Sequence, residues 1–129
     1  MTQEVYTFDW LEELRINLVE GLERLVPEDR IFKFSIPDEL TDEELSPVIK
    51  INLISLNPNN WAGDKVIGYH VSFLIDTWHN DYVECLVIAQ HIEYILRDMN
   101  FRQSSPIIDE DEDTKMYRNS RTYEANILI

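Results

Sequence analysis

Leucines spaced three and four positions apart mark the first helix of the chain, because this spacing places side chains on one helical face. We predict the helix over Phe8–Leu25. Asp9 and Glu12 form a plausible capping box at its start, and Pro27 stops it. The predicted apolar stripe consists of Leu11, Leu14, Leu18, Leu22 and Leu25.

A second apolar stripe predicts a helix over Asp81–Met99, with Asn80 as its cap. Charged and amide side chains fill the opposite side, so we expect this helix to pack on one face only. The stripe consists of Tyr82, Cys85, Ile88, Ala89, Ile92, Ile95, Leu96 and Met99.

Between the helices, apolar residues recur at every second position with polar residues between them, which is typical of strands with one buried face. We predict strands over Arg30–Ile36, Val48–Leu56 and Val66–Trp78. The last two form a hairpin around Asn57–Lys65, a segment rich in Asn, Pro and Gly that reads as a turn. Pro37–Pro47 reads as an exposed acidic loop.

The end of the chain predicts a second strand pair, Gln103–Asp109 and Lys115–Leu128. Its connector is a run of five acids, Asp109, Glu110, Asp111, Glu112 and Asp113. In the last strand, one face carries Tyr123, Ala125, Ile127 and Ile129.

The predicted order is therefore α-β-β-β-α-β-β in a single domain spanning residues 1–129. Two helices with one apolar stripe each need a sheet face to cover. We expect an α+β fold, a two-layer sandwich with both helices packed on one face of a mostly antiparallel sheet. The other face carries polar residues such as Lys50, Asn52, His70 and Ser72.

Composition and charge narrow the function classes. With 44% hydrophobic residues, the chain is expected to fold rather than remain disordered. Its net charge of -14, from 25 acids against 11 Lys and Arg, opposes binding to nucleic-acid phosphates. Cys85 is the only cysteine, which favours a reducing cytoplasm. We expect neither a secretory signal nor a membrane span.

Catalytic and metal motifs are not evident in the sequence. In the acid run, the sixth and twelfth positions of a calcium loop would fall on Thr114 and Ser120 instead of Gly and Glu, so we expect a solvated connector without metal. The separations of His70, His79 and His91 match no compact zinc spacing. Cys85 lies on an apolar stripe, which favours a structural role. We expect no cofactor and no enzymatic activity.

The element order, the chain length and the ending FRQSSPIIDEDEDTKMYRNSRTYEANILI resemble the tail terminator and tail-completion proteins of long-tailed bacteriophages. The resemblance implies a virion tail protein, assembled in the host cytoplasm, that forms a ring, usually a hexamer. Such a ring caps the tail tube and joins it to the head connector. Its implied partners are copies of itself, the tail tube protein and the head-tail connector protein, with DNA passing through a repelling acidic lumen.

We expect the assembly contacts on charged or aromatic surface segments, because an acidic loop of one ring subunit can meet a basic strand edge of the next. Trp61, in the predicted hairpin turn, is a further candidate anchor. The candidate interface residues are Asp38, Glu43, Trp61, Asp109, Asp111, Asp113, Lys115, Arg118 and Arg121.

Two other functions compete with this one. An acidic inhibitor that mimics DNA would explain the charge, but ten of the 25 acids lie in two connectors, 38–44 and 109–113, instead of along extended helix faces. A small hydrolase would need an assembled nucleophile and base, which the sequence does not offer.

Overall fold

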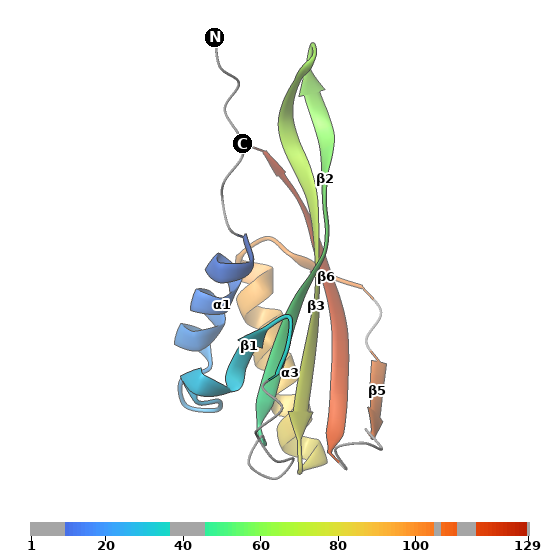
Figure 1. The fold of residues 1–129 in the computed structure, drawn as a ribbon. Coiled ribbons are helices and arrows are strands. Elements are labelled where there is room, and N and C mark those ends of the chain that lie inside the picture. Colours follow the sequence, from blue (N-terminus) through green and yellow to red (C-terminus); the bar gives the residue numbers. More distant parts are fainter. Residues whose placement is uncertain (1–9, 37–45, 105–106, 111–115, 129) are drawn as a thin grey trace.

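The computed structural model describes residues 10–36, 46–104, 107–110 and 116–128, and its elements are labelled as in Figure 1. The sheet is six-stranded, with the order β1-β2-β3-β6-β4 and with β5 also paired to β6. β1 pairs with β2 in parallel, and the other pairings are antiparallel. The elements are α1 (Trp10–Gly21), a 3-10 turn (Glu28–Arg30), β1 (Ile31–Lys33), β2 (Val48–Ala62), β3 (Lys65–His79), α3 (Tyr82–Asp98), β4 (Arg102–Gln103), β5 (Ile107–Glu110) and β6 (Tyr117–Leu128).

The structure confirms the α+β class and the mostly antiparallel sheet. The predicted order differs in one respect, because three strands follow α3 instead of two. The predicted strand Gln103–Asp109 is divided into β4 and β5, which pair with separate parts of β6. Gln103 is opposite Tyr123, whereas Ile107 is opposite Ser120.

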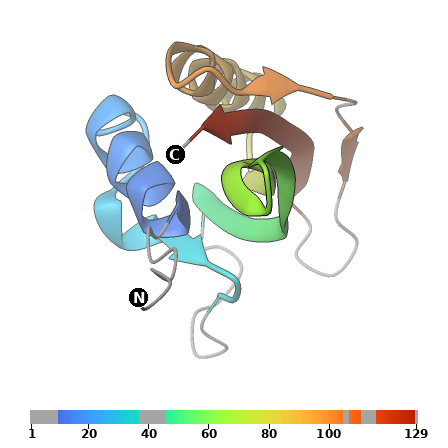
Figure 2. The same ribbon diagram turned by 90° about the horizontal axis from the view of Figure 1, so that it is seen from above.

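One apolar core joins both helices to the sheet. α1 and α3 lie on the same side of the strands (Figures 1 and 2) and contribute to one cluster of buried residues. From the strands, this cluster takes side chains that alternate with the outward ones, as a pleated sheet requires. Its members include Leu14, Leu18, Leu22, Ile49, Ile51, Val71, Phe73, Ile75, Ile88, Ile92, Leu96 and Tyr123.

Both predicted helices form, but their end residues differ from those predicted. α1 ends at Gly21, and the chain continues through turns in which Val26, not Leu25, is fully buried. Asp9 lies outside the described residues, so the predicted capping box cannot be placed. The cap of α3 is Asp81 instead of Asn80, because the Asp81 carboxylate accepts a hydrogen bond of 3.0 Å from the Glu84 N–H.

The helices approach each other closely at the end of α1. A Cβ atom placed on Gly21 would lie 2.9 Å from Cγ1 of Ile95 and closer still to its Cδ1. Real Cβ atoms essentially never come this near, so any residue with a Cβ at position 21 would require the Ile95 side chain to shift.

The predicted turn Asn57–Lys65 is wrong, because β2 and β3 continue to Ala62 and Lys65. Only Gly63 and Asp64 form the turn, where Gly63 has a φ of 68° and Asp64 does not share this positive φ, as in a type II′ hairpin. Pro58 is tolerated within β2 since β1 occupies the other edge of β2 only at Ile49–Ile51, among the described strands. Three register shifts interrupt the pairing of β2 with β3.

β1 is shorter than the predicted strand Arg30–Ile36. Phe34 has a φ of 66° and is exposed, which ends the strand after Lys33. Ile31 enters the main core, while Phe32 and Ile36 pack against a second small cluster of Val48, Trp78 and Met116. Val48 and Trp78 are paired across β2 and β3, next to the core pair Ile49 and Thr77, and so face away from the helices. This outer face is therefore apolar at one end.

Candidate assembly surfaces

The strands at the end of the chain pair with one another, because β4 and β5 both lie beside β6. Asp109 on β5 lies directly opposite Arg118 on β6, with Glu110 opposite Tyr117. The register thus brings one predicted acid and one predicted base together, although the side chains of β5 are not among those described. Arg118 is half-buried on the face away from the helices, where it is opposite Trp78. Asp38, Glu43, Asp111, Asp113 and Lys115 lie outside the described residues.

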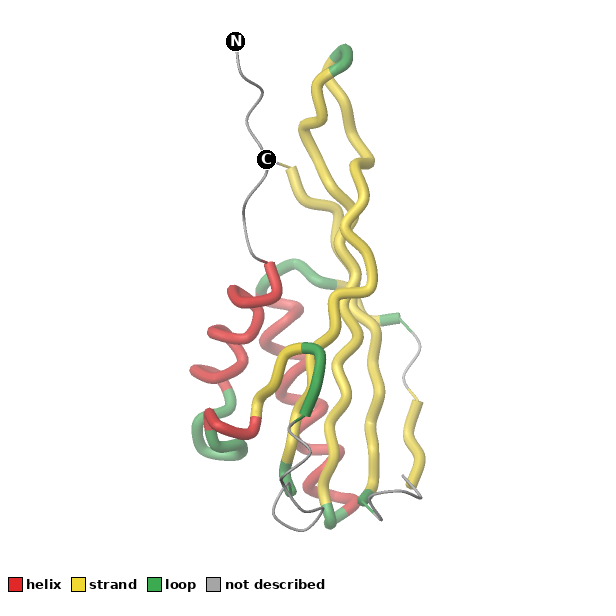
Figure 3. Tube along the Cα trace, in the orientation of Figure 1, coloured by secondary structure: helices red, strands yellow, loops and turns green. Residues whose placement is uncertain are grey.

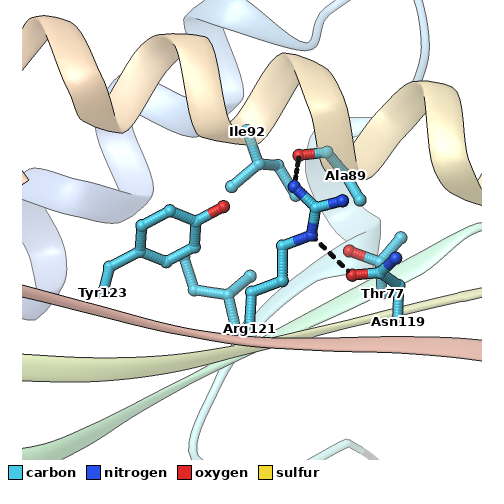
Figure 4. Close-up of a pocket in the computed structure, with 7 residues that line it drawn as sticks. Thr77, Ala89, Ile92, Asn119, Arg121 and Tyr123 are labelled. Atoms are coloured by element: carbon cyan, nitrogen blue, oxygen red, sulfur yellow. Dashed lines mark hydrogen bonds between the residues drawn. The ribbon is translucent and has the colours of Figure 1, made fainter. Parts of the chain in front are cut away.

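Arg121 is not an exposed edge residue, and its predicted exposure is wrong. It is 8% exposed and lies under α3, opposite Ile75 in the sheet. Its Nε donates to Oδ1 of Asn119 at 2.9 Å (Figure 4). Its Nη1 donates to Oε1 of Gln103 at 3.0 Å. Weaker contacts of 3.5 Å reach the Ala89 carbonyl and the Glu93 carboxylate.

The strand alternation already contained the signal for this burial. Arg121 is two residues from Tyr123, which the sequence placed on one face with Ala125 and Ile127, so Arg121 and Tyr123 must point to the same side. Reversal of its charge would place a carboxylate beside Glu93 in this enclosed space, and the folded subunit would not survive it.

The group around Arg121 holds elements together and offers no room for a ligand. The space between Arg121, Thr77, Asn119 and Tyr123 is too small for a water molecule. The Tyr123 hydroxyl donates to Gln103 at 3.4 Å, so α3, β4 and β6 meet at one polar cluster. Burial raises the pKa of Tyr123, an effect that the neighbouring Arg121 partly opposes. The function of this cluster is structural.

A second polar group lies on the outer face and was not predicted. Glu124 on β6 contacts Nε2 of His70 at 3.6 Å and accepts a hydrogen bond from Arg102 at 3.1 Å. The next outward residue on β6, Asn126, contacts Nδ1 of His70 at 3.0 Å and accepts from Asn59 at 2.7 Å. These contacts tie β2, β3, β4 and β6 together where no helix covers them.

Trp61 lies on a strand, not in a loop, and it is 53% exposed. It belongs to a segment that we call the distal arm, residues 54–70, which comprises the far ends of β2 and β3 and the turn between them. The arm extends past both helices (Figures 1 and 3). Positions 56–62 are all exposed, and Ile54 and Leu56 add exposed apolar surface to Trp61.

The cysteine and two of the histidines considered for chemistry are buried or hydrogen-bonded within the fold. Cys85 is buried, and this burial raises its pKa to about 11. The Nδ1 atom of His79 accepts the Asp81 N–H at 2.9 Å, and Nδ1 of His91 lies 2.9 Å from the Val87 carbonyl. The described residues hold no cluster of three His, Cys, Asp or Glu side chains placed to bind a metal ion. Within the same residues, no helix combines the length and apolar character needed to cross a membrane.

Comparison with known proteins finds a likeness in structure alone. No protein-family model matches the chain, and a search of the curated proteins finds no match. Among solved structures, the chain is similar to a protein chain in the virion of the native gene transfer agent (GTA) particle. The similarity covers 95% of this chain and 100% of that chain, with a TM-score of 0.60 and 12% sequence identity. At this identity, the comparison establishes a shared fold.

Proposed function

We propose that this protein is a structural subunit of a virion, and more specifically of its tail. In this proposal, its copies form a hexameric ring that caps the tail tube and joins it to the head-tail connector. The observation that carries the proposal is the fold match, which leaves neither chain with a large unmatched part. By analogy, a fold shared over 95% of this chain with one component of a virion is the reason for proposing a role in such a particle.

The shape and the charge of the subunit support an assembly role. A ring subunit needs two distinct surfaces for its neighbours, and a projecting arm beside a helix-covered body supplies surfaces of different character. The net charge of -14 suits a ring through which DNA passes, because a lumen of like charge does not retain DNA.

The proposed role requires no catalysis and no cofactor. Cys85 is poorly suited to be a nucleophile, since burial holds its thiol in the protonated form at neutral pH. The buried Arg121 is enclosed among its partners and lines no space large enough for a ligand. We therefore assign the polar clusters to the fold and propose that function resides in contacts between proteins.

Mass measurement and binding to tail tubes would test this function. Light scattering across a range of concentrations, with electron microscopy of the particles, should reveal closed rings, either for the protein alone or after addition of purified tail tubes. Rings at tube ends would support the proposal. If the protein neither forms rings nor binds tubes, and instead inhibits a DNA-binding enzyme as a monomer, the proposal fails and the DNA-mimic function replaces it.

A further inference from the structure

The distal arm differs from the rest of the molecule in charge. Residues 54–70 contain one acid, Asp64, and one base, Lys65, whereas the whole chain carries a net charge of -14. Two copies of such an acidic protein repel each other unless the touching surfaces are neutral or of opposite charge. The arm is a neutral surface with exposed apolar side chains at Ile54, Leu56 and Trp61, a composition found in the centres of protein interfaces.

The edge of the arm is poorly suited to adding another strand. Pro58 removes one N–H group, and the register shifts of β2 fall between Leu53 and Trp61. Such irregularities protect an edge from pairing with a further strand. A partner is therefore expected to bind the side chains of the arm, and Trp61 is the residue type that most often anchors such contacts.

A receiving surface of matching chemistry lies between the end of α3 and β4. It is a surface hollow of about 440 Å³, lined by Glu93, Arg97, Phe101, Arg102 and Gln103. The arginine side chains at its rim, Arg97 and Arg102, are 62% and 74% exposed. Arg97 pairs with Glu93 at 2.6 Å and Arg102 with Glu124 at 3.1 Å, so the rim, like the arm, is neutral in sum and does not repel it. The hollow is open to solvent and so is accessible to a side chain from another molecule. Arginine side chains bind aromatic faces, which makes an indole ring a suitable occupant.

The arm cannot fill the hollow of its own chain. Gln103 of β4 pairs with Tyr123 of β6, which is itself opposite Phe73 of β3. Phe73 is in turn opposite Leu53 of β2, so β4 lies at the height of Leu53 along the sheet. Trp61 lies eight residues farther along β2, which at about 3.3 Å per residue is on the order of 25 Å away, somewhat less after the bulges. The two surfaces are thus separate patches, and a contact between them must join different copies head to tail. Contacts of this kind generate closed rings where the rotation between subunits closes, and open filaments where it does not.

We propose that the distal arm docks on a second copy of this chain, with Trp61 in the hollow between α3 and β4 and with Asp64 beside Arg97 and Arg102. This proposal rests on the proposed function, for which it names the contact between neighbouring subunits. Trp61→Ala should weaken self-association about thirtyfold, as expected for a buried anchor residue. Phe34→Ala is the matched control, because Phe34 is an equally exposed aromatic residue outside both surfaces.

Cysteine cross-linking tests the contact directly. Asp64→Cys and Arg102→Cys are made singly and together, and the buried Cys85 can stay because it is not accessible to a maleimide. A short bis-maleimide is added to the protein alone and to the protein with purified tail tubes. Neither single variant should cross-link, their mixture should give dimers, and the double variant should give a ladder of oligomers.

Two results would overturn this inference. The first is the absence of any dimer in the mixture, both without and with tubes. The second is self-association of Trp61→Ala that equals the Phe34→Ala control. If rings still form on tube ends in either case, the proposed function stands and the subunits meet through other surfaces. If the mixture cross-links but nothing caps tubes, the contact is real and the tail function fails.

Discussion

The helix-covered body and the distal arm use the same two strands, yet they bury their side chains in opposite ways. In the body, Val71, Phe73 and Ile75 of β3 are fully buried beneath α1 and α3. In the arm, positions 56–62 of β2 are exposed, and the strands are held mainly by their own pairing. The difference indicates that the body supplies the stability of the subunit, which leaves the arm free to contact other proteins.

The largest expected effect comes from placing a charge in each region. Phe73→Asp buries an unpaired carboxylate in the core, which costs several kcal/mol, about the stability of a whole domain. Trp61→Asp places the same group in solvent and should leave the fold intact. Circular dichroism and thermal melting of the two variants test this contrast. Equal melting temperatures would show that the body is not the source of stability.

The cluster around Arg121 permits a finer test within β6. Arg121→Ala leaves Oδ1 of the buried Asn119 without this donor and leaves Gln103 with the longer bond from Tyr123. It should lower the free energy of unfolding by about 2 kcal/mol. Arg118→Ala changes the same residue type on the opposite face, where a half-exposed charge contributes about 0–1 kcal/mol. Urea unfolding measures both. A larger loss for Arg118 would contradict the burial described for Arg121.

The body and the arm each contain a glycine whose replacement should destabilise the fold, in the body through packing and in the arm through backbone conformation. Gly21→Ala should cost about 1 kcal/mol, at the low end for overpacking, because the new Cβ meets the flexible end of Ile95. Gly63→Ala meets no atom within 4 Å, and its cost of about 1 kcal/mol comes from the positive φ alone.

A second substitution separates these two causes. Ile95→Val shortens the side chain that the new Cβ of Gly21→Ala contacts. It should therefore restore part of the free energy of unfolding that Gly21→Ala loses, and none of what Gly63→Ala loses. Urea unfolding of the two single and two double variants gives the comparison. Equal recovery in both backgrounds would rule out the close approach of α1 and α3 as the cause.

The sequence predicted the body better than the arm. Repeated apolar spacing located both helices, because their buried stripes are long and regular, and period-two alternation located the strand Val66–Trp78, which β3 contains. The arm was missed since Asn57, Pro58 and Gly63 are local turn signals, whereas the length of a strand depends on its distant partner. In β2, that partner is β3, which continues the pairing to Lys65.

The candidate site was predicted least well, for a different reason. Charge was equated with exposure, yet Arg121 is buried because the alternation of β6 points it inward and polar groups from three elements surround it. The face opposite the helices was expected to be polar, but Val48 and Trp78 give it a small apolar cluster. The inward direction of Arg121 was readable from the strand alternation, but its partners on β4 and α3, like the outer cluster around Trp78, come from contacts between elements. Trp61 was identified correctly as an exposed aromatic residue, though on a strand instead of in a loop.

The smallest effect on stability, and the last test of the contrast, concerns thiol chemistry. Burial raises the pKa of Cys85 from 9.0 to about 11, so its thiol is both inaccessible and protonated at pH 8. A thiol introduced by Trp61→Cys is exposed on the arm and should react with a maleimide in seconds to minutes, whereas Cys85 in the parent should react only after unfolding. Because the folded pKa is the higher one, the stability contribution of the protonated thiol is complete below pH 9 and is lost as the pH rises toward 11. Labelling measured by mass spectrometry at pH 8, in native buffer and in urea, decides the matter. Rapid labelling of the native parent would mean that α3 does not seal the body, and the division into a closed body and an open arm would fall with it.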